Sequence, residues 1–356
     1  MISEPVVKTG DTVDNGGLFL STTNQNPSNM GSKIKTAQTR FLKKYRSSRS
    51  MKKNRLNPKK VNAGWRFIIR PVLVGIKFLP DTVLYLFSEI VGNCAFFLSG
   101  NTRRKAIQNL TTVFRHEKSL WEIRKISRQV FCGIARDVVS TGIYSLKKNR
   151  RGKALTENVR VEGTEYLDEA LKKGKGVICV SAHFGNFMIM TLRLSQMGYA
   201  CNMIVKDSNI PGEDKIWQHI RTQAGLAWIP ARPRFRAAAQ ALKWLKKGGV
   251  LFLYADRNKK GVRVTFFDRP AGFFKGPAVF HLRTGADLLC AFNVRQGRKK
   301  HKIIITPPIT VQKTGDFDKD IYQITQAYAH VIEKFVREHP EQWWWPHRNM
   351  SPKFRR

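Results

Sequence analysis

The sequence has few acidic residues. It contains 25 Asp and Glu against 64 Lys and Arg, so 356 residues carry a formal net charge of +39. A charge of this size indicates anionic partners, such as nucleic acid, an anionic membrane surface or charged substrates, and says little about the fold. Hydrophobic residues make up 42% and aromatic residues 11%. This composition excludes global disorder and predicts a packed core.

Closely spaced cysteines are also missing. The five cysteines, Cys94, Cys132, Cys179, Cys201 and Cys290, lie far apart and form no C-x-x-C pair. This pattern argues against a zinc ribbon or a disulfide framework and indicates a reducing compartment. No apolar segment follows Met1, so we expect no cleaved signal peptide.

The N-terminal part of the chain contains a polar segment followed by a basic segment. Residues 1–32 are rich in Ser, Thr, Asn and Gly, and we expect them to be disordered. Residues 33–64 form a basic arm, in which twelve Lys or Arg occur by Lys60 without one Asp or Glu. Such blocks usually act as interaction arms. Subtracting these twelve charges leaves +27 on the rest, which ends in a short basic tail at 351–356.

Residues 65–100 are the most apolar stretch. Charged residues and two prolines, Pro71 and Pro80, interrupt it, and it contains no run of about twenty uncharged residues. We therefore expect two short helices at a membrane surface rather than one clean transmembrane helix. The other interpretation is a helical hairpin that packs on the domain. The preceding basic arm would suit an anionic leaflet.

Residues 101–350 are predicted to form one α/β domain. Ser119 and Glu122 form a capping box that starts a helix over 119–144. Further on, four short apolar runs are typical of buried strands: 176–182, 250–255, 286–294 and 301–309. The helical stretches between and after them are 164–173, 187–198, 213–224, 236–247, 275–285 and 317–338. The alternation predicts a mainly parallel sheet flanked by helices.

The carboxyl ends of two predicted strands carry the chemistry. His183 follows the strand at 176–182, and Asp256 ends the strand at 250–255. Open α/β sheets bind ligands at such ends, where a histidine can act as general base on a hydroxyl. The other interpretation is a histidine that only caps the next helix.

A basic loop is predicted after Asp256. Its cations indicate a site for phosphates or carboxylates, although an ordinary solvated loop would show the same pattern. The candidate substrate-binding residues are Arg236, Arg257, Lys259, Lys260, Arg263 and Lys275, and Arg221 could join them. No metal is expected, because the histidines and Asp256 lack ligand spacing.

Three consecutive tryptophans, Trp343, Trp344 and Trp345, stand near the end. They cannot all be buried on one face, so at least one is expected to line a groove or an interface. The other interpretation is core packing of the last segment.

These segments in order resemble the bacterial lauroyl/myristoyl acyltransferases of lipid A biosynthesis, within the lysophospholipid acyltransferase superfamily. The similar segments are RRKAIQNLTTVF (103–114), VEGTEYLDEALKKGKGVICVSAHFGNF (161–187), LKKGGVLFLYAD (245–256), GP (276–277) and PEQWWWPHR (340–348). The resemblance implies an enzyme at the cytoplasmic face of the inner membrane. It would need no cofactor and would move an acyl chain from an acyl-carrier-protein or CoA thioester to an anionic glycolipid or lysolipid. Specific nucleic-acid binding is not expected, because no such module is recognisable.

The chain departs from the family at one position. In the family's His-x4-Asp/Glu motif the histidine is the base and the acid orients it. His183 matches the base, but Met188 stands where the acid should be, and a thioether cannot hold an imidazolium. Three hypotheses follow: Asp256 or Asn186 replaces the acid, His183 works alone at a reduced rate, or the protein binds lipid or carrier protein without turnover.

Overall fold

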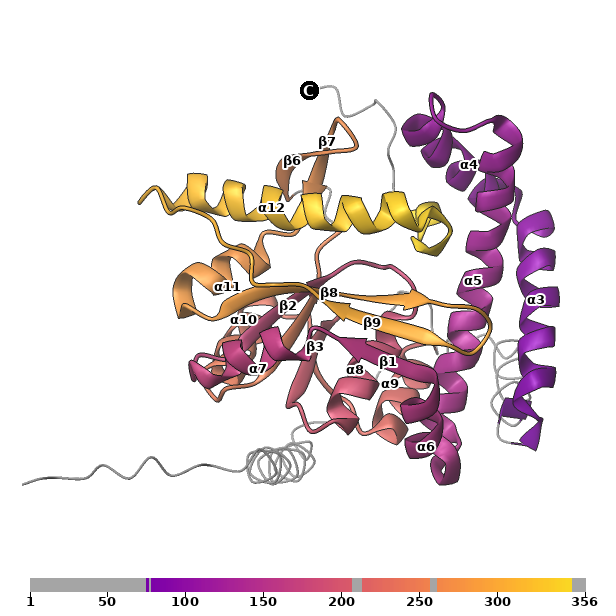
Figure 1. Cartoon of the computed structure of the whole chain (residues 1–356), viewed down its shortest axis with the longest axis horizontal. Helices are drawn as coiled ribbons and strands as arrows, with labels where there is room; N and C mark the ends of the chain where they lie inside the picture. Colours follow the sequence, from indigo (N-terminus) through magenta and orange to yellow (C-terminus); the bar gives the residue numbers. More distant parts are fainter. Residues whose placement is uncertain (1–74, 77, 207–212, 257–260, 348–356) are drawn as a thin grey trace, which may run out of the picture.

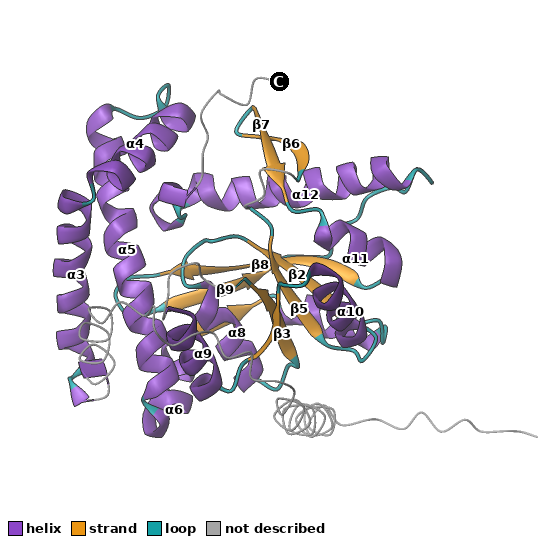
Figure 2. Cartoon of the chain, turned by 180° about the vertical axis from the view of Figure 1, so that it is seen from behind, coloured by secondary structure: helices purple, strands orange, loops and turns teal. Residues whose placement is uncertain are grey.

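The computed structural model describes residues 75–76, 78–206, 213–256 and 261–347. The predicted disordered segment at 1–32, the basic arm at 33–64 and the tail at 351–356 lie outside these residues. The described part is an α/β fold in which helices cover both faces of a central sheet (Figures 1 and 2).

The central sheet has seven strands. Their order across the sheet is β1 (Val159–Glu162), β9 (His301–Ile305), β8 (Asp287–Arg295), β2 (Val177–Ser181), β5 (Val250–Tyr254), β3 (Cys201–Val205) and β4 (Ala227–Pro230). All neighbours are parallel except β8 and β9. The predicted fold class is therefore confirmed, and β1, β3 and β4 are short strands that sequence analysis missed.

The central strands are buried on both sides. All five residues of β2 are buried, and alternate side chains point to opposite faces. Ile178 and Val180 join a core with α10 (Arg234–Leu245), α11 (Gly276–Thr284) and α12 (Phe317–Glu338). Val177 and Cys179 face α7 (Thr164–Lys172) and α8 (Phe187–Gln196), with α6 (Lys148–Asn158) and α9 (Glu213–Ala224) beyond. The five cysteines are all free thiols, as predicted.

Helix α5 (Leu120–Leu146) is the longest described helix and stands at one end of the sheet (Figure 1). The predicted capping box is present: the Ser119 side chain accepts the backbone N–H of Glu122, and the Glu122 carboxylate accepts that of Ser119. α5 packs against α4 (Gly100–Phe114) and α3 (Asp81–Leu98) and brings its own inner face to the site.

The prediction of two short helices over 65–100 falls partly outside the described residues. Gly75, Ile76 and Phe78 are helical, Pro80 interrupts the helix, and α3 follows as an 18-residue helix with Pro80 at its N-cap. By length and composition it could cross a membrane. Its two charged residues form ion pairs with α5, Glu89 with Arg136 at 2.8 Å and Asp81 with Lys147 at 2.6 Å.

The predicted basic loop after Asp256 is wrong in part. Residues 262–273 form an antiparallel hairpin, β6 (Val262–Phe266) and β7 (Arg269–Phe273), that packs on α12. Phe267 and Asp268 both have positive φ, 52° and 56°, as a two-residue type I′ hairpin turn requires. Since neither residue is Gly or Asn, the sequence carries little signal of this turn.

Candidate functional site

The register of two parallel strands brings His183 and Asp256 together. Ser181 at the end of β2 pairs with Tyr254 at the end of β5, and the backbone N–H of Ala255 donates to the Ser181 carbonyl at 2.9 Å. Two residues further along each strand, His183 stands beside Asp256. Both therefore lie at the carboxyl edge of the sheet, where open α/β sheets bind ligands.

The two side chains form a close pair. His183 Nδ1 lies 2.7 Å from Asp256 Oδ1, and the His183 backbone N–H donates to Asp256 Oδ2 at 3.1 Å. The Asp256 side chain is 2% exposed, whereas that of His183 is 22% exposed. A carboxylate at Nδ1 favours the tautomer with its proton there and leaves Nε2 unprotonated, on a ring that lines the cavity. This is the arrangement that a general base needs.

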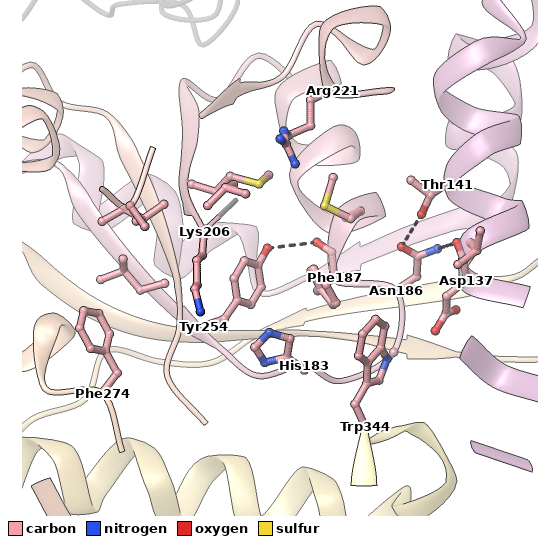
Figure 3. A pocket seen from close by; sticks show the side chains of 18 residues that line it. Asp137, Thr141, His183, Asn186, Phe187, Lys206, Arg221, Tyr254, Phe274 and Trp344 are labelled. Atoms are coloured by element: carbon pink, nitrogen blue, oxygen red, sulfur yellow. Dashed lines mark hydrogen bonds between the residues drawn. The ribbon is translucent and has the colours of Figure 1, made fainter. Parts of the chain in front are cut away.

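His183 lines a cavity of about 580 Å³. Figure 3 shows the imidazole between Tyr254 and Trp344, with Phe187 close by. The ring centroids of these three aromatic residues lie 5.5 to 6.1 Å from that of His183. Other side chains in the wall are mostly apolar, among them Val138, Met188, Met203, Ile204, Val205, Leu253 and Phe274. The cavity can therefore hold an apolar chain next to a basic nitrogen.

The turn after His183 is held by the fold behind it. Gly185 has φ 50°, and a side chain there would collide with the Asn293 carbonyl. Asn186 caps α8, since its Oδ1 accepts the Ile189 N–H, and its Nδ2 donates to the Asp137 carbonyl at 2.9 Å. Asn186 therefore fixes α8 to α5, and its contacts give no support to the alternative in which it orients His183.

Met188 lies in the first turn of α8 and lines the cavity. It is 8% exposed and belongs to the apolar core on that side of the sheet. The position of the missing motif acid is thus part of the apolar wall, while the contact to His183 Nδ1 comes from Asp256 on the neighbouring strand.

The three tryptophans alternate in direction. Trp343 and Trp345 are 1% and 0% exposed, whereas the half-buried Trp344 lines the cavity. The prediction that at least one lines a groove is confirmed. The Asn109 side chain of α4 donates to the Trp345 carbonyl at 2.8 Å, so the predicted N-terminal segment around 103–114 packs on the tryptophan segment.

A second buried ion pair lies behind the turn, and sequence analysis missed it. Arg295 Nη1 of β8 contacts Asp137 Oδ1 of α5 at 2.7 Å, with both side chains buried. Asp137 also lines the cavity. Burial raises the pKa of Asp137, and the charge of Arg295 opposes this effect. No motif marks the pair, because its members are 158 residues apart.

The three predicted substrate-binding cations that the structure describes are not among the residues that line the cavity. Arg236, Arg263 and Lys275 are exposed and stand elsewhere on the surface. Arg257, Lys259 and Lys260 lie outside the described residues, so a role of any of the six in binding a headgroup stays a prediction. Among the described residues, two cations line the cavity: Arg221, which stacks on Trp228 at 5.0 Å, and Lys206, which sequence analysis missed. Within the described ranges, no group of three or more His, Cys, Asp or Glu could hold a metal ion.

Comparisons with known proteins agree with the resemblance seen in the sequence. Phosphatidylinositol mannoside acyltransferases of two Mycobacterium tuberculosis strains, ATCC 25618 / H37Rv and CDC 1551 / Oshkosh, are each 26% identical over 189 residues. The match covers 51% of this chain and 57% of each relative. A family model described as bacterial lipid A biosynthesis acyltransferase matches residues 50–351. The chain therefore belongs to the bacterial lipid A biosynthesis acyltransferase family.

Proposed function

We propose that this protein is a membrane-associated acyltransferase that moves a fatty acyl chain from a thioester to an anionic glycolipid or lysolipid. The observation that carries the proposal is the 2.7 Å contact between His183 Nδ1 and Asp256 Oδ1 at the wall of an apolar cavity. The donor would be an acyl-carrier-protein or CoA thioester, and the acceptor group a hydroxyl or an amine. Lipid A precursors are the default acceptor from the family, and the relatives' name adds phosphatidylinositol mannosides.

The proposed reaction needs one base and no cofactor. His183 Nε2 takes the proton of the acceptor hydroxyl while the hydroxyl oxygen attacks the thioester carbonyl carbon. Asp256 stabilises the imidazolium that forms. The C–S bond then breaks, and the leaving thiolate takes the proton back from the imidazolium. The products are an acyl ester and a free thiol, and His183 returns to its starting state.

The cavity wall suits the acyl chain of the donor. Met188, Met203 and Leu253 give it an apolar surface, and methionine side chains adapt to chains of different shape. The cations Lys206 and Arg221 line the same cavity, while the chain outside residues 33–60 carries +27. A cationic protein attracts both an acidic carrier protein and a phosphorylated acceptor.

Helix α3 is the proposed membrane contact. Seven of its large apolar side chains are exposed: Val83, Leu86, Phe87, Ile90, Val91, Phe97 and Leu98. Its charged residues are paired with α5, so the outer face offers an uncharged apolar surface. The basic arm that precedes it in sequence would add attraction to an anionic leaflet. We place the protein at the cytoplasmic face of the inner membrane, where the acyl thioesters are.

A vesicle assay tests the membrane contact. Replacing Ile90 with Asp places a charge on the outer face of α3 and should release the protein from phosphatidylglycerol vesicles in a flotation assay. Phe235→Asp is the matched control, because Phe235 is 70% exposed on α10, at the far side of the sheet from α3 (Figure 1). Equal flotation of the two variants would contradict the assignment of α3.

A turnover assay tests the reaction. The full chain in detergent receives a labelled acyl-carrier-protein or CoA thioester and a panel of sugar-bearing and simple lysolipid acceptors. We expect acyl transfer that falls by about 10³-fold or more in His183→Ala. Transfer that persists in His183→Ala would refute the assigned base. Saturable lipid binding without any turnover would instead favour the non-catalytic alternative.

A further inference from the structure

Asp256 has a partner that sequence analysis did not predict. The indole N–H of Trp343 donates to Asp256 Oδ2 at 2.9 Å. Trp343 is 1% exposed and packs edge-to-face on Phe266 and Trp345. It is not among the residues that line the cavity, and its indole N–H reaches the site through Asp256.

The carboxylate oxygens of Asp256 have different partners. Oδ2 accepts two neutral donors, the Trp343 indole and the His183 backbone N–H, whereas Oδ1 faces His183 Nδ1. Neutral N–H donors stabilise a carboxylate charge without cancelling it. Because both donors approach Oδ2, the carboxyl group cannot rotate without losing them, and Oδ1 stays aimed at the imidazole.

The backbone holds Trp343 in register with the histidine. Phe184 and Trp343 form an antiparallel bridge. The N–H of Gly185 donates to the Gln342 carbonyl at 2.8 Å, and that of Trp344 donates to the His183 carbonyl at 3.1 Å. The tryptophan segment therefore pairs with the turn that carries His183. Its successive side chains go to opposite sides, Trp343 to Asp256 and Trp344 to the cavity.

We propose that Trp343 is a positioning residue of the His183–Asp256 pair. Its N–H fixes Asp256 so that His183 carries its proton on Nδ1 and presents Nε2 to the acceptor. The catalytic readout of this inference rests on the proposed function, since it assumes that His183 is the base.

Two tryptophans of the same segment give a matched test. Trp343→Phe removes the N–H to Asp256, while Trp345→Phe removes an equally buried indole whose N–H donates to the Pro340 carbonyl. In the acyl-transfer assay, we expect kcat of Trp343→Phe to fall about 10- to 100-fold, as for loss of a hydrogen bond to a charged group. KM for the acceptor should stay within about twofold, because Trp343 is not among the residues that line the cavity. In Trp345→Phe, kcat should stay within about threefold of the natural chain.

Coupling to Asp256 separates positioning from general packing. In an Asp256→Asn background, adding Trp343→Phe should have almost no further effect on kcat, because the residue acts through Asp256. Equal losses in Trp343→Phe and Trp345→Phe, or a full additive loss on top of Asp256→Asn, would overturn the proposal.

A spectroscopic readout keeps this inference distinct from the proposed function. In ¹⁵N-histidine-labelled protein, the His183 signal is identified by its absence in His183→Ala, and we expect an Nδ1–H tautomer. Trp343→Phe should change this signal and Trp345→Phe should not; an unchanged signal in Trp343→Phe would refute positioning. Should Trp343→Phe fail to fold, benzothienylalanine at position 343, which keeps the shape without the N–H, replaces it in both measurements. A chain without His183-dependent turnover would refute the proposed function, while the tautomer would still decide the role of Trp343.

Discussion

Two buried carboxylates near the cavity differ in the partner that each one contacts. Asp256 pairs with His183, a titratable ring that is 22% exposed on its side chain, and Asp137 pairs with Arg295, a permanent cation that is 5% exposed. Both contacts measure 2.7 Å, so the distance alone does not distinguish them.

The partner decides what each carboxylate can do. Imidazole can accept and return a proton near neutral pH, and its second nitrogen faces the cavity, so the Asp256 pair suits proton transfer. Guanidinium keeps its charge, so the Asp137 pair can only hold α5 against β8. One pair should therefore affect activity and the other stability, and four substitutions test this division.

The largest expected effect is that of Asp256→Asn on activity. The amide oxygen would stay with the two N–H donors now at Oδ2, which turns the NH₂ group toward His183 Nδ1. His183 must then carry its proton on Nε2 and cannot act as base. We expect kcat to fall by about 10⁴-fold, as it does when Asn replaces the Asp of a Ser-His-Asp triad. The free energy of unfolding should change by no more than about 2 kcal/mol. Single-turnover acyl transfer and urea unfolding measure the two effects, and normal turnover would contradict the pairing.

Asp137→Ala should have the reverse profile. It leaves Arg295 buried without its carboxylate, which typically costs about 3–5 kcal/mol of stability. The double variant Asp137→Leu, Arg295→Met should recover much of this loss, because it removes both charges. Denaturant unfolding measures stability, and the folded fraction of Asp137→Ala should remain far more active than Asp256→Asn. A larger loss of kcat than of stability would assign Asp137 to the chemistry.

Met188→Glu restores the family's motif acid, yet we expect no gain. Asp256 already occupies His183 Nδ1, and a carboxylate at 188 would stand in the apolar wall. The penalty for a polar group in an apolar site predicts a fall in kcat/KM of about tenfold. Met188→Leu, which conserves volume, should stay near the natural value. Higher activity of Met188→Glu in the transfer assay would show that His183 lacks an acid in the natural protein.

The sequence predicted the elements of the site better than its contacts. Apolar runs ending at His183 and Asp256 were sufficient to place both at strand ends, because buried parallel strands have a simple pattern. That the two strands are neighbours in register depends on the whole sheet order, which no local pattern contains. The short strands β1, β3 and β4 and the type I′ turn at Phe267–Asp268 were missed for the same reason: tertiary contacts, not propensity, hold them.

Long-range polar contacts were the least predictable. Arg295 pairs with Asp137 and Trp343 with Asp256 across 158 and 87 residues, and each looks ordinary in its own segment. The run of three tryptophans predicted a residue in a groove, which is Trp344. It did not predict the hydrogen bond from the Trp343 indole nitrogen to Asp256, on which the proposed positioning role depends. The cations Arg236, Arg263 and Lys275 are conspicuous in the sequence, but the sequence could not show that they lie outside the cavity wall; their role in binding a headgroup stays a prediction.

The smallest expected effect is on the pH dependence of stability, and it arises at His301, a histidine near Arg295. His301 is 1% exposed, and burial together with nearby Arg295 lowers its pKa to about 3. In the unfolded chain a histidine has a pKa of about 6.5. Between these values only the unfolded state binds the proton, so this contribution to stability is lost as pH falls, by at most about 1.4 kcal/mol per pH unit.

His301→Gln removes that contribution and leaves the other titrating groups in place. The stability difference between the natural chain and the variant should be constant above about pH 7.5 and should fall steadily toward about pH 5. Urea unfolding at a series of pH values measures it. A difference independent of pH would mean that folding does not shift the pKa of His301, and would contradict the effect of burial and of Arg295. The acyl-transfer rate of the folded protein, in contrast, should be the same in both proteins at each pH, because His301 is not among the residues that line the cavity.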